Sequence, residues 1–170
     1  QIGAELGSDI PFCIMGGTCL ATGRGEKVEM LPAFPTTYVL LIKPDFSVST
    51  PWAYRVFDEE PPQKKPDYKH MLQIIQEGRL DQIQEEMINM LEKPVMREYP
   101  VLQEIKEKIL EEGAMASAMS GSGPTVYGLF REEKTVRAAY AKLRSTLPYR
   151  YQVICTQTEN PRYQIKGEWK

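Results

Sequence analysis

A glycine-rich segment between two apolar runs is the feature that most constrains how this chain can fold. Residues 114–119 (AMASAM) are small and apolar, residues 120–124 read Ser-Gly-Ser-Gly-Pro, and residues 125–130 (TVYGLF) are rich in β-branched and aromatic side chains. This order predicts a strand, a tight loop and a second strand. Glycine adopts backbone conformations that a Cβ forbids, so the loop can direct consecutive N–H groups toward one point.

Two interpretations of this loop are open from its sequence. Backbone N–H groups and serine hydroxyls can bind a phosphate, and the residues that would do so are Ser120, Gly121, Ser122 and Gly123. A glycine-rich hairpin turn that binds nothing has the same pattern. The choice between them therefore depends on the rest of the chain.

The composition excludes several classes of protein. Of the 170 residues, 42% are hydrophobic and 26% are charged, which is typical of a globular domain. The 21 basic and 23 acidic residues leave a net charge of −2, so no general attraction to nucleic acid or to an anionic membrane is expected. No stretch approaches the roughly 20 apolar residues of a membrane span. A small-molecule partner fits this balance better than a nucleic acid or a membrane.

The cysteines and the single histidine leave little room for metal or disulfide chemistry. The sequence contains three cysteines, an odd number, and none of them forms a C-x-x-C pair (Cys13, Cys19 and Cys155). This argues against a disulfide framework or a cysteine zinc site and favours a reducing cytoplasm. His70 is the only histidine, so a multi-histidine metal site is excluded. We predict no metal site in this chain.

Hydrophobic periodicity predicts an α+β fold with helices on one face of a largely antiparallel sheet. The strand over 37–43 is apolar on both faces and should be central in the sheet. The other expected elements are a β-hairpin over 18–31, helices over 52–57, 67–78, 81–91, 98–112 and 132–147, and a strand over 151–156.

Proline and charge patterns suggest how the chain is organised. Residues 32–35 (PAFP) are the best candidate for a linker, which divides the chain into domains 1–36 and 37–170. Residues 1–6 read as the end of a helix, and the residues after Glu159 form a polar, basic tail.

Three further segments could carry chemistry. Asp9 stands between a glycine and a proline, where a carboxylate could accept a proton from a substrate hydroxyl or help hold a metal, or could simply cap its own turn. Arg24, between two glycines, could meet a phosphate or belong to an ordinary hairpin turn. Trp52 and Tyr54 could stack on a nucleobase or fill the edge of a core.

Taken together, these segments resemble the GHMP kinase superfamily. The resemblance covers nearly the whole chain up to the tail and is carried by residues 6–12 (LGSDIPF), 16–18 (GGT), 23–26 (GRGE), 89–92 (NMLE), 99–100 (YP) and 116–130 (ASAMSGSGPTVYGLF). It implies a GHMP kinase C-terminal domain over 37–170, preceded by the end of the N-terminal GHMP domain over 1–36.

The resemblance also implies an activity. The expected protein transfers a phosphoryl group from ATP, with Mg²⁺, to the 2-hydroxyl of a cytidine diphosphate-linked methylerythritol in the non-mevalonate isoprenoid pathway. Asp9 would be the catalytic carboxylate, Thr50 and Tyr54 would bind substrate, and the loop 120–123 would lie beside the phosphates. The alternatives are another GHMP kinase, for homoserine, mevalonate or a sugar, and a non-catalytic α+β interaction module.

One part of the superfamily pattern does not occur in this sequence. The ATP-binding loop, P-x-x-x-G-L-G-G-G-S-S, is absent from the 170 residues. We therefore expect a C-terminal fragment of a cytoplasmic kinase that is inactive by itself, because the triphosphate would lack its helix N-terminus. Sheet edges left exposed would favour self-association.

Overall fold

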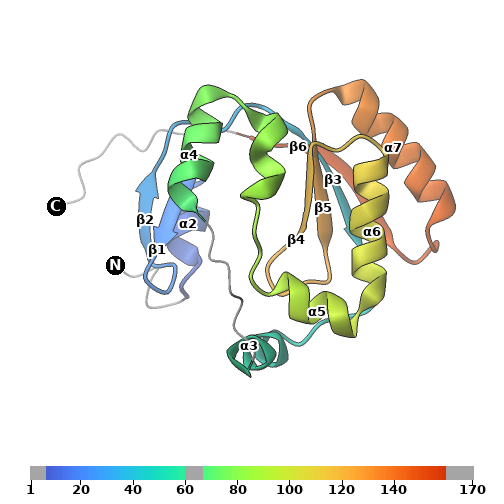
Figure 1. Cartoon of the computed structure of the whole chain (residues 1–170), viewed down its shortest axis with the longest axis horizontal. Coiled ribbons are helices and arrows are strands. Elements are labelled where there is room, and N and C mark those ends of the chain that lie inside the picture. The colour runs from blue at the N-terminus through green and yellow to red at the C-terminus, as the bar shows by residue number, and fades with distance from the viewer. Residues whose placement is uncertain (1–6, 60–66, 160–170) are drawn as a thin grey trace. The chain divides into compact units, whose positions relative to one another are not determined.

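The computed structural model describes residues 7–59 and 67–159 (Figure 1). The chain divides into two compact units, of which unit 1 contains the described residues 7–36 and 158–159, and unit 2 contains 37–59 and 67–157. The predictions for residues 1–6 and for the tail after Glu159 lie outside the described residues.

Unit 2 is built on a four-stranded antiparallel sheet. Its strand order is β4-β5-β3-β6, formed by β3 (Tyr38–Lys43), β4 (Ala116–Met119), β5 (Val126–Phe130) and β6 (Gln152–Gln157). The central place predicted for the strand over 37–43 is confirmed, because β3 pairs with both β5 and β6. Leu40 and Ile42 of this strand are fully buried.

Two long helices pack on the sheet and enclose the main core. Helix α6 (Pro100–Glu111) packs on β4 and β5, and α7 (Glu133–Thr146) packs on β3 and β6. Gly128 of β5 is what allows α6 to approach, because a Cβ at this position would lie 2.2 Å from Cγ2 of Ile109. Helices on a largely antiparallel sheet are the α+β arrangement expected from the sequence.

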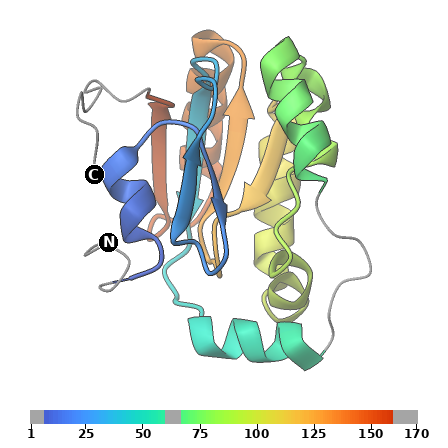
Figure 2. The ribbon, with the colours of Figure 1, turned by 90° about the vertical axis from the view of Figure 1, so that its left-hand side faces the viewer.

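The remaining helices of unit 2 are α3 (Thr50–Glu59), α4 (Tyr68–Glu77), the 3₁₀ helix η1 (Leu80–Glu85) and α5 (Glu92–Glu98). Helices α3 and α5 pack together at one end of the sheet (Figure 2). Tyr99 joins them to the core. Its ring stacks on that of Phe46, with 5.2 Å between the ring centroids, and meets the ring of Trp52 edge-on, with 5.8 Å between the centroids. Trp52 therefore fills the edge of the core, one of the two roles considered for it.

One helix prediction in unit 2 is wrong. The helix expected over 81–91 is the short η1 followed by turns, whereas the helix expected over 98–112 is confirmed as α6, which follows α5 after Tyr99. Proline disfavours a helical conformation in the residue before it, so Tyr99 separates the two helices. Within residues 7–59 and 67–159, no helix is both long and apolar enough to span a membrane.

The described residues of unit 1 form one short helix and the predicted β-hairpin. Strands β1 (Cys19–Thr22) and β2 (Lys27–Met30) pair in antiparallel register. The helix α2 (Ile10–Met15) is not among the elements expected from the sequence, and it carries Pro11 in its first turn. Proline is tolerated in the first turn of a helix, where its missing N–H would have no partner.

Candidate functional site

The glycine-rich loop closes the β4–β5 hairpin as the sequence predicted. The N–H of Ser120 donates to the carbonyl of Thr125 at 2.8 Å, and the N–H of Gly123 donates to the carbonyl of Ser120 at 2.9 Å. Gly121 and Gly123 have φ of 55° and 86°, a region that side chains with a Cβ rarely adopt. The loop is thus a tight turn with its serines at the end of the sheet.

The first turn of α3 contacts this loop. The Thr50 and Ser122 hydroxyl oxygens lie 2.8 Å apart and form a hydrogen bond. Tyr54 follows Thr50 by four residues, so the two occupy the same face of α3. The Tyr54 side chain is 55% exposed. The structure therefore brings Thr50, Tyr54 and the loop together at the end of the sheet where α3 and α5 lie (Figures 1 and 2).

Two polar side chains hold the start of the loop: Asn89, from the segment between η1 and α5, and Glu92, the first residue of α5. The Asn89 amide nitrogen donates to the carbonyls of Met119 and Gly121, each at 2.8 Å. The Glu92 carboxylate accepts from the N–H of Met119 at 2.9 Å and also pairs with Lys106. Sequence reasoning gave these residues no role beyond the NMLE resemblance, since it placed Asn89 on a helix.

Glu92 also affects Tyr127, a half-buried tyrosine of the adjacent strand β5. Burial raises the pKa of the Tyr127 hydroxyl above its ordinary value, and the negative charge of Glu92 raises it further. Tyr127 therefore stays neutral at physiological pH and acts as a packing residue of β5 rather than as a proton acceptor.

Asp9 belongs to unit 1, where it precedes α2. It occupies the N-cap position, yet its side chain makes no capping hydrogen bond, so the capping role considered for it is wrong. Its carboxylate is exposed and lies against the hairpin turn, because a Cβ on Gly25 would stand 3.5 Å from its Oδ1. The geometry leaves the carboxylate available for chemistry.

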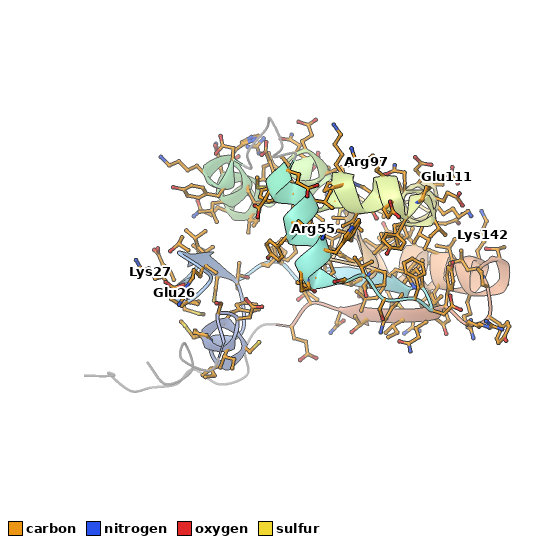
Figure 3. All side chains as sticks on the ribbon, turned by 90° about the horizontal axis from the view of Figure 1, so that it is seen from below. Glu26, Lys27, Arg55, Arg97, Glu111 and Lys142 are labelled. Carbon is orange, nitrogen blue, oxygen red and sulfur yellow. The ribbon has the colours of Figure 1, made fainter. Side chains whose placement is uncertain are left out.

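The hairpin turn beside Asp9 is closed by a second carboxylate. The N–H of Arg24 donates to Oε2 of Glu26 at 2.7 Å. Hydrogen bonds from the N–H groups of Glu26 and Arg24 lower the pKa of the Glu26 carboxyl, and the charges of Arg24 and Lys27 lower it further. Glu26 and Lys27 are labelled side by side in Figure 3. These contacts favour the hairpin-turn interpretation of the glycines around Arg24.

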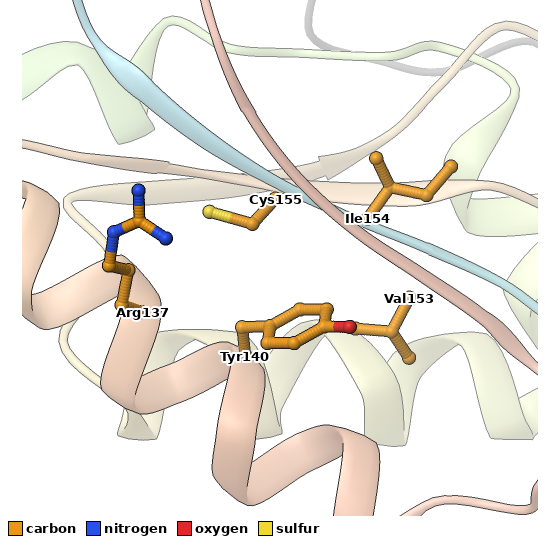
Figure 4. A pocket seen from close by; sticks show the side chains of 5 residues that line it. All are labelled: Arg137, Tyr140, Val153, Ile154 and Cys155. Atoms are coloured by element: carbon orange, nitrogen blue, oxygen red, sulfur yellow. The ribbon is translucent and has the colours of Figure 1, made fainter.

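A separate hollow of about 530 Å³ lies between α7 and β6 (Figure 4). It is open to solvent and is lined by Arg137, Tyr140, Val153, Ile154 and Cys155. The Arg137 guanidinium pairs with Glu133 at 2.6 Å, and this hydrogen bond raises the pKa of Arg137. None of the predicted site residues lines this hollow, so it is distinct from the candidate site.

The described residues do not form a metal-binding cluster. Across 7–59 and 67–159, no group of three or more His, Cys, Asp or Glu side chains could hold a metal ion. Mg²⁺ is commonly held by one or two carboxylates together with the phosphates of a bound nucleotide, so the expected Mg²⁺ would bind with ATP rather than in such a cluster.

Comparison with known proteins finds small-molecule kinases that are similar to this chain. Residues 71–148 match the family model described as GHMP kinases C terminal. A curated relative from Moorella thermoacetica, named 4-diphosphocytidyl-2-C-methyl-D-erythritol kinase, is 42% identical over 159 residues, covering 92% of this chain and 55% of the relative. The chain thus spans about half the length of the curated relatives it matches.

Solved structures of kinases are similar to the chain as well. A crystal structure of 4-(cytidine 5'-diphospho)-2C-methyl-D-erythritol kinase superposes with a TM-score of 0.74 and 28% identity, covering 92% of this chain and 56% of that one. A homoserine kinase from Cytophaga hutchinsonii superposes with a TM-score of 0.67 at 17% identity, covering 89% of this chain and 50% of that one. The second likeness shows the shared fold alone.

Proposed function

Because this chain carries a GHMP kinase C-terminal domain, we propose that it is part of an ATP-dependent kinase for 4-diphosphocytidyl-2-C-methyl-D-erythritol. The observation that carries the proposal is the contact of Thr50 with Ser122, which joins the exposed Tyr54 to a loop suited to phosphate. The names of the relatives at 42% and 28% identity support the same substrate. The homoserine kinase at 17% identity gives no support to homoserine as the substrate.

The proposed reaction is transfer of a phosphoryl group to an alcohol. The 2-hydroxyl oxygen of the substrate forms a bond to the γ-phosphorus of ATP as the bond from that phosphorus to ADP breaks. The hydroxyl proton passes to the carboxylate of Asp9, which acts as the general base. An exposed carboxylate that caps no helix suits this task.

The loop and α3 have separate proposed roles. Ser120 and Ser122 contact phosphate oxygens through their hydroxyls and Gly121 through its N–H, while the N–H of Gly123 keeps the turn closed by donating to the carbonyl of Ser120. The ring of Tyr54 stacks on the cytosine, and the Thr50 hydroxyl keeps α3 beside the loop. Charge then accumulates on the phosphoryl oxygens where fixed donors can stabilise it.

Two expectations from the sequence stay predictions. One is a cytoplasmic location. The other is self-association of the isolated 170 residues, which the exposed apolar side chains of unit 1 support, since Phe12, Ile14 and Met30 are 42%, 60% and 48% exposed. We propose the kinase activity for the complete protein rather than for these residues by themselves.

The test is phosphorylation of 4-diphosphocytidyl-2-C-methyl-D-erythritol by the complete protein with ATP. Asp9→Asn keeps the shape of the side chain but removes the base, so kcat should fall by about 10²-fold or more. Asp81→Asn is the matched control. Asp81 is exposed and its ion pair with Arg131 spans 3.8 Å, so kcat should change by less than about twofold.

Two results would contradict the proposal. Phosphorylation of homoserine or mevalonate in preference to the cytidine-linked alcohol would assign another GHMP substrate. An Asp9→Asn protein as active as the wild type would remove Asp9 from the reaction.

A further inference from the structure

Strand β4 lies at the edge of the sheet, so half of its backbone groups have no strand beside them. Met119 is the last residue of β4, and its backbone N–H and carbonyl both form hydrogen bonds with side chains. Glu92 accepts from its N–H at 2.9 Å and Asn89 donates to its carbonyl at 2.8 Å. These bonds are made at the residue where the strand becomes the glycine-rich loop.

Asn89 extends the same interaction into the loop. Its amide nitrogen also donates to the carbonyl of Gly121 at 2.8 Å, so the two accepting carbonyls lie on either side of Ser120. The amide oxygen of Asn89 accepts from the N–H of Leu91 at 3.0 Å. This last bond fixes which end of the amide faces the loop, because a reversed amide would place oxygen against two carbonyl oxygens.

Glu92 connects the loop to the core of unit 2. Its carboxylate pairs with Lys106 of α6, and the two side chains are only 14% and 17% exposed. Removing either partner of a largely buried ion pair leaves an uncompensated charge, so the pair holds a defined geometry. The hydrogen bond to Met119 is charge-assisted and is therefore stronger than a bond between neutral groups.

We propose that Asn89 and Glu92, named here the loop clamp, are positioning residues that hold the loop 120–123 in its phosphate-binding conformation before substrate arrives. The inference rests on the kinase function proposed above. Glycine-rich loops sample many conformations, and donors stabilise a transition state best when they are already in place. The clamp contacts the backbone of the loop on the side of Met119, so it acts through the loop rather than on the substrate.

The informative variant is Asn89→Asp. It keeps the size of the side chain and the oxygen that accepts from Leu91, but it removes both donors to the loop. Gln84→Glu is the matched control, because Gln84 of η1 bonds to the same edge strand. Gln84 accepts from the N–H of Ser117 at 2.7 Å, and a carboxylate accepts the same bond. Both variants replace an amide by an acid, but only Asn89→Asp removes donors to the loop and places a carboxylate oxygen against its two carbonyls.

The first measurement is amide hydrogen exchange in the complete protein without substrate. In Asn89→Asp, the amides of Ser120 and Gly123 should exchange about tenfold faster than in the wild type, and in Gln84→Glu less than about twofold faster. The amides of α7 should be unchanged in both variants. The clamp is overturned if Ser120 and Gly123 of Asn89→Asp exchange at the wild-type rate. It is also overturned if the amides of α7 exchange faster by the same factor as those of the loop. This result does not depend on kinase activity.

The second measurement is steady-state kinetics of the same proteins. Asn89→Asp should lower kcat by about tenfold or more while KM for the cytidine-linked substrate changes by less than about threefold. Faster loop exchange with an unchanged kcat would overturn the positioning role. A wild-type protein without kinase activity would instead refute the proposed function, and the exchange data would still decide whether the clamp orders the loop.

Discussion

The hydroxyl oxygen of Thr50 lies 2.8 Å from that of Ser122, although 72 residues separate them along the chain. One hydroxyl donates to the other, and the bond joins the first turn of α3 to the loop that closes β4 and β5. Tyr54 lies one helical turn beyond Thr50, so this bond also sets the place of its exposed ring relative to the loop.

A double-mutant cycle tests this hydrogen bond. Thr50→Val and Ser122→Ala each remove one hydroxyl, and in the complete protein the two changes should couple by about 0.5 kcal/mol in the free energy of unfolding, since an exposed bond contributes at the low end of the range. Urea denaturation measures the coupling. Ser145→Ala is the control for Ser122, because Ser145 bonds the carbonyl of Lys142 in its own helix. Strict additivity of Thr50→Val and Ser122→Ala would contradict the contact.

Tyr54 offers a test of nucleobase binding. Tyr54→Ala should weaken binding of cytidine diphosphate to the complete protein by about tenfold, because stacking of one base on an aromatic ring contributes about 1–3 kcal/mol. Tyr54→Phe keeps the ring face and should bind nearly as the wild type does. Titration calorimetry measures both, with Tyr68→Ala as control, since Tyr68 is a similarly exposed tyrosine on α4. Equal affinity of Tyr54→Ala and the wild type would assign the base to another residue.

The parts of the fold that follow from local periodicity could be predicted. The expected helix over 132–147 is α7, because its apolar residues recur on one face over four turns. The helix expected over 81–91 has a similar spacing of apolar residues, yet only the short η1 forms there, and Asn89 beyond it bonds the carbonyls of Met119 and Gly121. Long-range hydrogen bonds replaced the local preference there.

In the candidate site, too, the features set by local sequence could be predicted and those set by long-range contacts could not. The loop 120–123 could be found from its glycines, since their positive φ is a local requirement of the turn. The role of Asn89 could not, because an asparagine within an apolar-periodic segment carries no sign of the two distant carbonyls it meets. The only sign of a role for Asn89 in the sequence is that residues 89–92 resemble a known family. That resemblance singles out the position but does not reveal which groups the side chain contacts.

The Glu26 carboxylate gives a prediction for pH. Hydrogen bonds to backbone N–H groups lower its pKa below the ordinary 4.5, so the folded turn prefers the ionised form. The contribution of Glu26 to the turn is therefore present above pH 4.5 and is lost as the pH falls through the lower, folded value. An NMR titration should show a midpoint for Glu26 below 4.5 and a matching step in the Arg24 amide shift.

Two variants separate this effect from general acid unfolding. Glu26→Gln should remove the step in the Arg24 amide shift, while Glu29→Gln on the neighbouring strand should leave it. A Glu26 midpoint at or above 4.5 would show that the backbone bonds do not favour the carboxylate.

Gly128 tests the packing of α6 on the sheet that supports the site. A Cβ here would lie 2.2 Å from Cγ2 of the fully buried Ile109 and 3.2 Å from Cβ of Ala114, so Gly128→Ala should destabilise the complete protein by about 1–3 kcal/mol. Ile109→Ala should cost about 2–5 kcal/mol through the cavity it leaves. Ile109→Ala also removes the methyl group, Cγ2, with which the new Cβ at position 128 would clash. In urea denaturation, the double variant should therefore lose less free energy of unfolding than the sum of the two single variants. Additive losses would mean that α6 does not approach β5 as closely as the structure shows.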